Sequence, residues 1–365
     1  MKAAGGSISS AETVILTAAA AFAAGVFVVP RLLVADAGRA GILALGLAAA
    51  FAIGWAGLMA ARANLTAQRS LPLALTRRAG LYGRAWLGLL ALFEVMLAGV
   101  VILSYSAMAA TVVLPGTPRY VVAGLIAAAA FTAARHRVQG LARTVFVSFT
   151  FAGTLAVLAF ALLLARSAQI ASVLPGPHLA ALPIAFGAFD AMLLFAGVTS
   201  LVAFMPAQAR PRGVPAVVVG TSVAAILVAI AYVAAVGTGG PAYSLTQLWP
   251  VVSALRTLVL ASFVLNRFGL VVVLSWSAFV LAFAAIHIWA AAEYATLAIG
   301  SARRRPLLAL AATALAFSVL FMGGSQAANE SLLREVVAPA TVLVFLSWVV
   351  LGLAVTARGA GEEAS

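Results

Sequence analysis

Cysteine is absent from this 365-residue chain and lysine is nearly so, which removes several kinds of chemistry at once. Without cysteine there are no disulfide bonds, thiolate metal sites or cysteine nucleophiles. Lys2 is the only lysine, so no Walker A phosphate loop can form, and the motifs Gly-x-Ser-x-Gly, Ser-x-x-Lys and His-Glu-x-x-His do not occur. Only three histidines are present, and their sequence spacing makes no local metal site. We therefore expect neither an enzyme nor a cofactor.

Charged residues are also scarce, at 8% of the chain, whereas 65% of the residues are hydrophobic and the mean hydropathy is +1.15. A soluble domain cannot bury that much apolar surface. Because the hydrocarbon layer of a bilayer needs roughly 20 helical residues to cross it, the long apolar runs predict membrane spans. We place ten spans near residues 11–33, 41–61, 85–114, 120–134, 144–165, 184–207, 215–236, 268–299, 307–322 and 339–356.

The formal net charge of +13 comes from arginines that are spread over the short loops, an arrangement that does not favour a nucleic-acid site. Lys and Arg in short loops are retained on the cytoplasmic side of a membrane. A cytoplasmic N-terminus puts 15 of the 22 basic residues inside and seven outside, so both termini are predicted to be cytoplasmic. Cleavage of the first span as a signal peptide would invert this asymmetry, so we expect the span to be retained.

Glycine and proline interrupt two of the predicted spans at matching positions. The first span carries Gly25 and Pro30, and the sixth carries Gly197 and Pro206. Transporters built from inverted repeats place unwound helices at corresponding positions in their two halves, where the freed backbone groups bind substrate. The matched pair predicts a single membrane domain over residues 1–365. It contains a five-plus-five inverted repeat, with one repeat at about 8–166, the other at about 183–356, and helices 1 and 6 broken.

Three acidic residues fall inside predicted spans, namely Glu94, Asp190 and Glu293. Ionisable groups at membrane depth are costly and usually face a cavity or a partner. Asp190 and Glu293 lie near span ends, where interfacial water is close, whereas Glu94 lies deeper. Glu94 is therefore the candidate buried carboxylate. His287 also lies inside a span, where a packed, hydrogen-bonded neutral imidazole is the simpler expectation.

Several short motifs, in this order and spacing, resemble the GerAB spore-germination proteins of the amino acid/polyamine/organocation superfamily. The resemblance covers about residues 8–322, and the chain departs from the family pattern at Arg137 and Val198. The motifs are Leu32-Leu33 to Asp36-Ala37-Gly38, Leu114-Pro115-Gly116-Thr117-Pro118, Ala134-Arg135 to Gly140-Leu141-Ala142-Arg143, Gly197 followed by Pro206, and Pro250 to Arg256, Arg267 and Trp276.

The resemblance implies a LeuT-like fold in the inner membrane of a spore. It also implies a role as the membrane subunit of a germinant receptor, beside an A subunit and a lipoprotein C subunit. A small amino acid would bind between spans one, three, six and eight, with its carboxylate on backbone N–H groups at the two breaks. The candidate ligand-binding residues are Gly25, Val26, Phe27, Tyr105, Phe195, Gly197, Thr199, Ser200, Ser275 and Ser277.

An amino-acid permease is the alternative that these residues leave open. The same pocket would then alternate its access and couple uptake to a cation or a proton. Hydroxyl groups of Ser275 and Ser277, with carbonyls of the broken first helix, are candidate sodium ligands. Glu94 is the candidate proton carrier.

Overall fold

The computed structural model describes residues 7–22, 25–66, 69–166, 169–177, 179–208, 213–259, 268–321 and 326–357. Lys2, Ala23, Ala24, His178 and Arg267 lie outside these ranges. The described chain is helical throughout apart from short connections and one isolated bridge between Ile8 and Gln208. Its main helices are α1 (Ser10–Phe22), α2 (Val29–Ala37), α3 (Gly41–Asn64), α4 (Leu71–Val112), α5 (Arg119–Ala134), α6 (Val138–Arg166), α7 (Ala181–Phe195), α8 (Leu201–Phe204), α9 (Gly213–Thr246), α10 (Pro250–Arg256), α11 (Phe268–Ile299), α12 (Arg305–Ser318), α13 (Gln326–Ser331) and α14 (Ala338–Ala357).

Eight helical stretches among the described residues are long and apolar enough to cross a membrane. Two further apolar helices, α1 and α5, are shorter. The prediction of an all-helical, multi-pass membrane protein is therefore confirmed, and the count of ten spans stays a prediction. The eight stretches are Val29–Asn64, Leu71–Val112, Val138–Arg166, Ala181–Ala207, Gly213–Thr246, Phe268–Ile299, Ala302–Phe321 and Ala328–Ala357.

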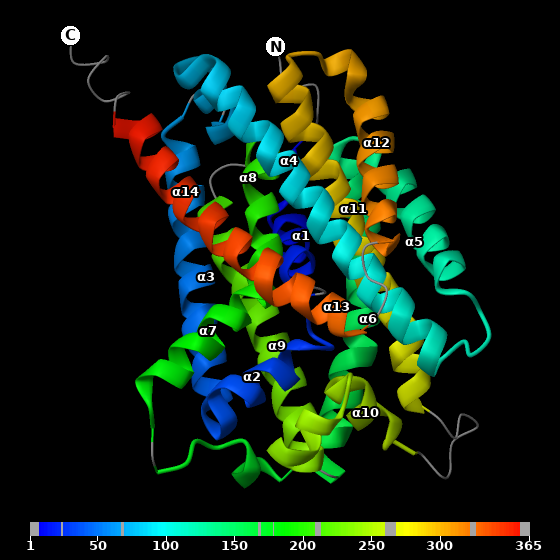
Figure 1. Ribbon diagram of the computed structural model, residues 1–365. Coiled ribbons are helices and arrows are strands. Elements are labelled where there is room, and N and C mark those ends of the chain that lie inside the picture. Colours follow the sequence, from blue (N-terminus) through cyan, green and yellow to red (C-terminus); the bar gives the residue numbers. More distant parts are fainter. Residues whose placement is uncertain are drawn as a thin grey trace.

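Helix α1 lies at the centre of the bundle, with the two chain termini at one end and α2 and α10 towards the other (Figure 1). It packs against α6, α9 and α11, while α11 in turn packs against α4, α5 and α12. The outer helices carry large exposed apolar side chains, such as Leu125, Val147 and Val350. A soluble protein rarely exposes so much contiguous apolar surface, whereas a lipid-facing surface requires it.

Helices α4 and α9 extend beyond the membrane spans that the sequence predicted there. The sequence places residues 71–84 in a loop because Arg77, Arg78 and Arg84 interrupt the apolar pattern, but α4 already begins at Leu71. The Ser70 hydroxyl caps this helix by accepting a 3.2 Å hydrogen bond from the Leu73 N–H. Gly80, at φ +53°, then kinks α4 without ending it. Helix α9 likewise runs to Thr246, past a second kink at Gly240.

Candidate functional site

The first apolar stretch is interrupted between α1 and α2. Helix α1 ends at Phe22, and Gly25 lies at φ +72°, a conformation that a residue with a side chain adopts only at a cost. The Gly25 carbonyl then accepts hydrogen bonds from the N–H groups of Val28 (2.9 Å) and Val29 (2.8 Å), which begin the new helical direction. Pro30 in the first turn of α2 has no N–H that would need a partner there.

The stretch that contains Gly197 also changes its helical form. Helix α7 ends at Phe195, and the next five residues, Ala196–Ser200, form the tighter helical segment η4 before α8 begins. Segment η4 packs against α1, α4 and α11. A Cβ atom at Gly197 would lie 2.8 Å from His287 Nε2 and would overlap the backbone carbonyl oxygen of Ala20. Only glycine lets α1 and η4 approach this closely.

A fully buried polar cluster lies beside that contact. The Glu94 carboxylate of α4 pairs with His287 Nδ1 of α11, and the Thr199 hydroxyl of η4 lies 3.1 Å from Glu94 Oε1. The other imidazole nitrogen lies 3.4 Å from the Ala20 carbonyl oxygen of α1. Glu94, His287 and Thr199 are fully buried. Four separate segments therefore meet at one cluster.

The hydrogen bond between Glu94 and His287 can be made in either direction, because His287 Nδ1 can donate to the carboxylate or accept from a carboxyl group. When Nε2 carries a proton, it can donate to the Ala20 carbonyl oxygen. The sequence analysis missed this pairing because Glu94 and His287 are 193 positions apart.

An aromatic cluster brackets the break between α1 and α2. The Trp276 ring of α11 lies 5.4 Å from the ring of Phe22, at the end of α1, and 4.9 Å from the ring of Phe27, after the break. Phe22 also packs at 4.8 Å on Phe279, one turn further along α11. Trp276 is fully buried, and its indole N–H has no hydrogen-bond partner among the described residues. Ring packing thus helps to hold the break between α1 and α2.

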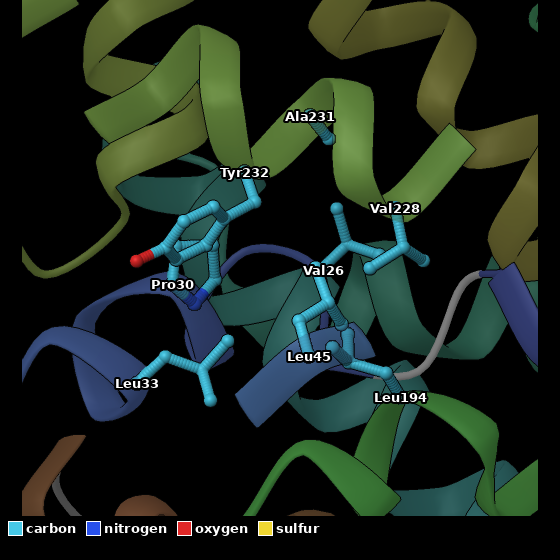
Figure 2. Close-up of a pocket in the computed structure, with 8 residues that line it drawn as sticks. All are labelled: Val26, Pro30, Leu33, Leu45, Leu194, Val228, Ala231 and Tyr232. Atoms are coloured by element: carbon cyan, nitrogen blue, oxygen red, sulfur yellow. The ribbon is translucent and has the colours of Figure 1, made fainter. Parts of the chain in front are cut away.

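The space beside the break at Gly25 is nearly closed. Gly25, Phe27 and Tyr105 line a cavity of about 10 Å³ together with Val28, Val101, Ser104 and Val280, which is room for about one water molecule. Behind the break, Figure 2 shows a second contact zone in which Val26, Pro30 and Leu33 face side chains of α3, α7 and α9. No water molecule fits into this zone. Neither of these two spaces is large enough for an amino acid.

The predicted ligand-binding residues are brought only partly together. Thr199 joins the Glu94 cluster, and Ser200 donates to the Gly197 carbonyl of its own segment. The Tyr105 hydroxyl reaches the Val273 and Leu274 carbonyls of α11 at 3.5 Å. Ser275 donates to Val272 within α11, Ser277 lies against the Tyr105 hydroxyl, and Val26 and Phe195 are buried in apolar surroundings.

Ion pairs also join the helices. Arg305, at the start of α12, binds Glu293 of α11 at 2.9 Å. Arg31 of α2 binds Glu330 of α13 at 2.8 Å. Arg334, in the π-helical segment η8 (Leu332–Val337), binds Asp36 at 2.6 Å and Asp190 at 2.8 Å. Asp190, expected near interfacial water, is instead buried in an ion pair.

Solved structures show which fold this arrangement has. MhsT in complex with L-phenylalanine is 17% identical in sequence, with a TM-score of 0.61 over 94% of this chain and 91% of that chain. A manganese transporter from Eremococcus coleocola is 12% identical, with a TM-score of 0.57 over 94% of this chain and 78% of that chain. The protein therefore has the fold of the LeuT-type membrane transporters.

The family is shown by the sequence itself. The family model for spore germination proteins matches residues 7–327, nearly the whole chain. The chain belongs to this family, as its resemblance to the GerAB proteins predicted. A comparison with curated proteins finds no match.

Proposed function

We propose that this protein is the membrane subunit of a spore germinant receptor, which binds a small amino acid where its two interrupted helices meet. The observation that carries the proposal is the contact between η4 and the Ala20 carbonyl of α1, beside the Glu94, His287 and Thr199 cluster. At this contact, backbone of α1 and of η4 lies next to buried polar groups. Membership of the spore germination family supports the receptor role.

We further propose the membrane arrangement that this role needs. Helices α1 and α2 together form one broken span, α7 to α8 form the second broken span, and α5 is a short span. The chain then has ten spans in two inverted repeats, at about residues 8–166 and 183–356, with both termini in the cytoplasm. The A and C subunits of the receptor are its proposed partners, and the inner spore membrane is its proposed location.

Ligand binding would act on the closed contact between α1 and η4. The space at Gly25 is too small for an amino acid, so binding requires α1 and η4 to separate. Separation frees backbone N–H groups near Gly25 and Gly197 for the ligand carboxylate, and Thr199 for a hydrogen bond. A ligand that fits only the separated arrangement shifts the protein towards it, and partner subunits that contact α1 or η4 sense the shift.

Substituting valine for Gly197 tests the binding site, with L-alanine as the probe. Gly197→Val should abolish L-alanine binding to the purified protein, because the added side chain fills the contact that the ligand must enter. Gly54→Val is the matched control, because a Cβ atom at Gly54 meets nothing within 4 Å. Binding that survives in a folded Gly197→Val protein would place the ligand elsewhere.

A permease is the second candidate, favoured by the likeness to transporters and by the buried pair of Glu94 and His287. Vesicles that contain the protein alone separate the two functions. A receptor binds L-alanine without concentrating it, whereas a proton-coupled permease concentrates it when the vesicle interior is alkaline. Concentrative uptake that disappears in Glu94→Gln would establish the permease and overturn the receptor.

A further inference from the structure

Three charged side chains from three segments far apart in the sequence meet in one cluster. Arg334 of η8 donates to Asp36 of α2 at 2.6 Å, and its Nε lies 2.8 Å from an oxygen of Asp190 on α7. One guanidinium thus serves two carboxylates. The cluster carries a net charge of −1 when all three groups are ionised.

The two carboxylates keep binding capacity that Arg334 does not use. Asp190 is only 4% exposed, and its Oδ2 atom makes the ion pair without a hydrogen bond. Asp36 Oδ2 is also shielded from solvent and has no hydrogen-bond partner. The two carboxyl groups lie within hydrogen-bonding reach of each other. The buried carboxylate of Asp190 and the partly exposed carboxylate of Asp36 repel each other when both are ionised, so a further cation beside them is electrostatically favoured.

These groups line a cavity that is large enough for a small ligand. The cavity holds about 340 Å³ and is partly open, and its apolar walls are Leu182, Pro183, Phe186 and Phe189 of the α7 region. Pockets for small molecules begin at about 300 Å³. Asp190 precedes Gly197 by seven residues, which is about 10 Å of helix, so this cavity is separate from the contact between α1 and η4.

The donor and acceptor groups select the ligand chemistry. An ammonium group has three N–H donors and matches the two carboxylates. The Arg334 side chain is 40% exposed, so its guanidinium can also donate hydrogen bonds to a ligand carboxylate. Apolar ring faces of Phe186 and Phe189 suit a short apolar side chain. No group of three acidic or metal-ligating side chains occurs among the described residues, which disfavours a metal ion as the occupant.

We propose that this cavity is a second, outer binding site for a small amino acid zwitterion. Its ammonium group contacts the carboxyl oxygens of Asp36 and Asp190 from the side of the cavity, its carboxylate faces Arg334, and its side chain packs on Phe186 and Phe189. The site holds the ligand before the ligand reaches the helix breaks. The inference rests on the proposed function for the class of ligand and on the proposed membrane arrangement for the outer position of the site.

The number of L-alanine molecules bound per protein tests the inference, measured by equilibrium dialysis of the purified, full-length protein. The unmodified protein should bind two molecules, and Asp190→Asn and Asp36→Asn should each bind one. N-acetyl-L-alanine, which has no ammonium group, should not compete at the outer site. Glu293→Gln is the control, because it removes one carboxylate charge from a separate ion pair, the one with Arg305.

A further variant keeps the test valid if the aspartate variants do not fold. Phe186 is 59% exposed, so Phe186→Lys should fold, and its ammonium group should displace the ligand from the carboxylates. That protein should also bind one molecule instead of two. Unchanged binding in folded Phe186→Lys or in either aspartate variant would overturn the outer site.

The outcomes also separate this inference from the proposed function. If Gly197→Val still binds two molecules while Asp190→Asn binds one, the outer site stands and the site at the helix breaks is wrong. If Gly197→Val loses the only molecule bound and Asp190→Asn keeps it, the outer site is wrong and the proposed function stands. No L-alanine binding by the unmodified protein at tens of millimolar would overturn both.

Discussion

Replacing Gly197 by alanine should force α1 and η4 apart, and the structure indicates the size of the effect. The new Cβ atom would overlap the Ala20 carbonyl oxygen and lie 2.8 Å from His287 Nε2. Overpacking of a buried contact typically costs about 1–3 kcal/mol. The upper part of that range applies here, because the obstacle is backbone and cannot move away as a flexible side chain can.

The control for this prediction is Gly54→Ala. Gly54 lies inside α3, is exposed, and has free space around the position of a Cβ atom. Alanine is a better helix former than glycine by about 0.5–1 kcal/mol, so this variant should be as stable as the parent protein or slightly more stable. The difference between the two alanine variants, measured by thermal unfolding, isolates the contact between α1 and η4.

Separation of the two segments can be measured directly, because the chain has no cysteine of its own. Ser200→Cys places a thiol of nearly the same size in η4, where the serine is fully buried. Maleimide labelling of this thiol should be slow in the closed protein and several-fold faster when Gly197→Ala is added. Equal labelling rates, together with an unchanged unfolding temperature, would refute the argument that glycine is required for the closed contact.

Three further changes test other parts of the structure. Glu94→Ala should destabilise the protein by about 3–5 kcal/mol in chemical unfolding, because it leaves the buried His287 without its carboxylate partner. Glu94→Gln should destabilise the protein less. Equal effects of the two variants would argue against the pairing of Glu94 with His287. Gly80→Ala should cost about 1–2 kcal/mol, because the α4 kink needs a positive φ angle there; a stabilised protein would show that the kink is not required. Trp276→Leu should lower the unfolding temperature and increase protease cleavage near the α1–α2 break, since Phe22 and Phe27 both pack on this ring; unchanged cleavage would contradict that role.

The sequence alone determined that the chain folds as a bundle of membrane helices. Long apolar runs and few charges leave no other structure for a backbone in lipid, because every N–H and C=O group must be bonded within the helices. The glycines Gly25 and Gly197, followed by Pro30 and Pro206, led to the prediction of two broken helices, since conformational freedom is a local property; that the two helices are broken in matching repeats stays a prediction. The role of these positions in ligand binding stays a prediction.

Local pattern failed where tertiary packing overrides composition. Arg77, Arg78 and Arg84 suggested a loop, yet they are exposed residues of α4, whose other face buries Leu75 and Leu87 against the bundle. Hydropathy averages over all faces of a helix. It therefore cannot distinguish a loop from a helix that has one charged face and one buried face.

Only the tertiary structure decided which polar groups meet. Glu94 lies 193 positions from His287, and Asp36 lies 298 positions from Arg334. Each pairing depends on the rotation of two helices about their axes and on their relative depth, and both are set by side-chain packing along the whole contact. No periodicity within one helix records those quantities, so the sequence presents these residues as isolated charges and the fold makes them pairs.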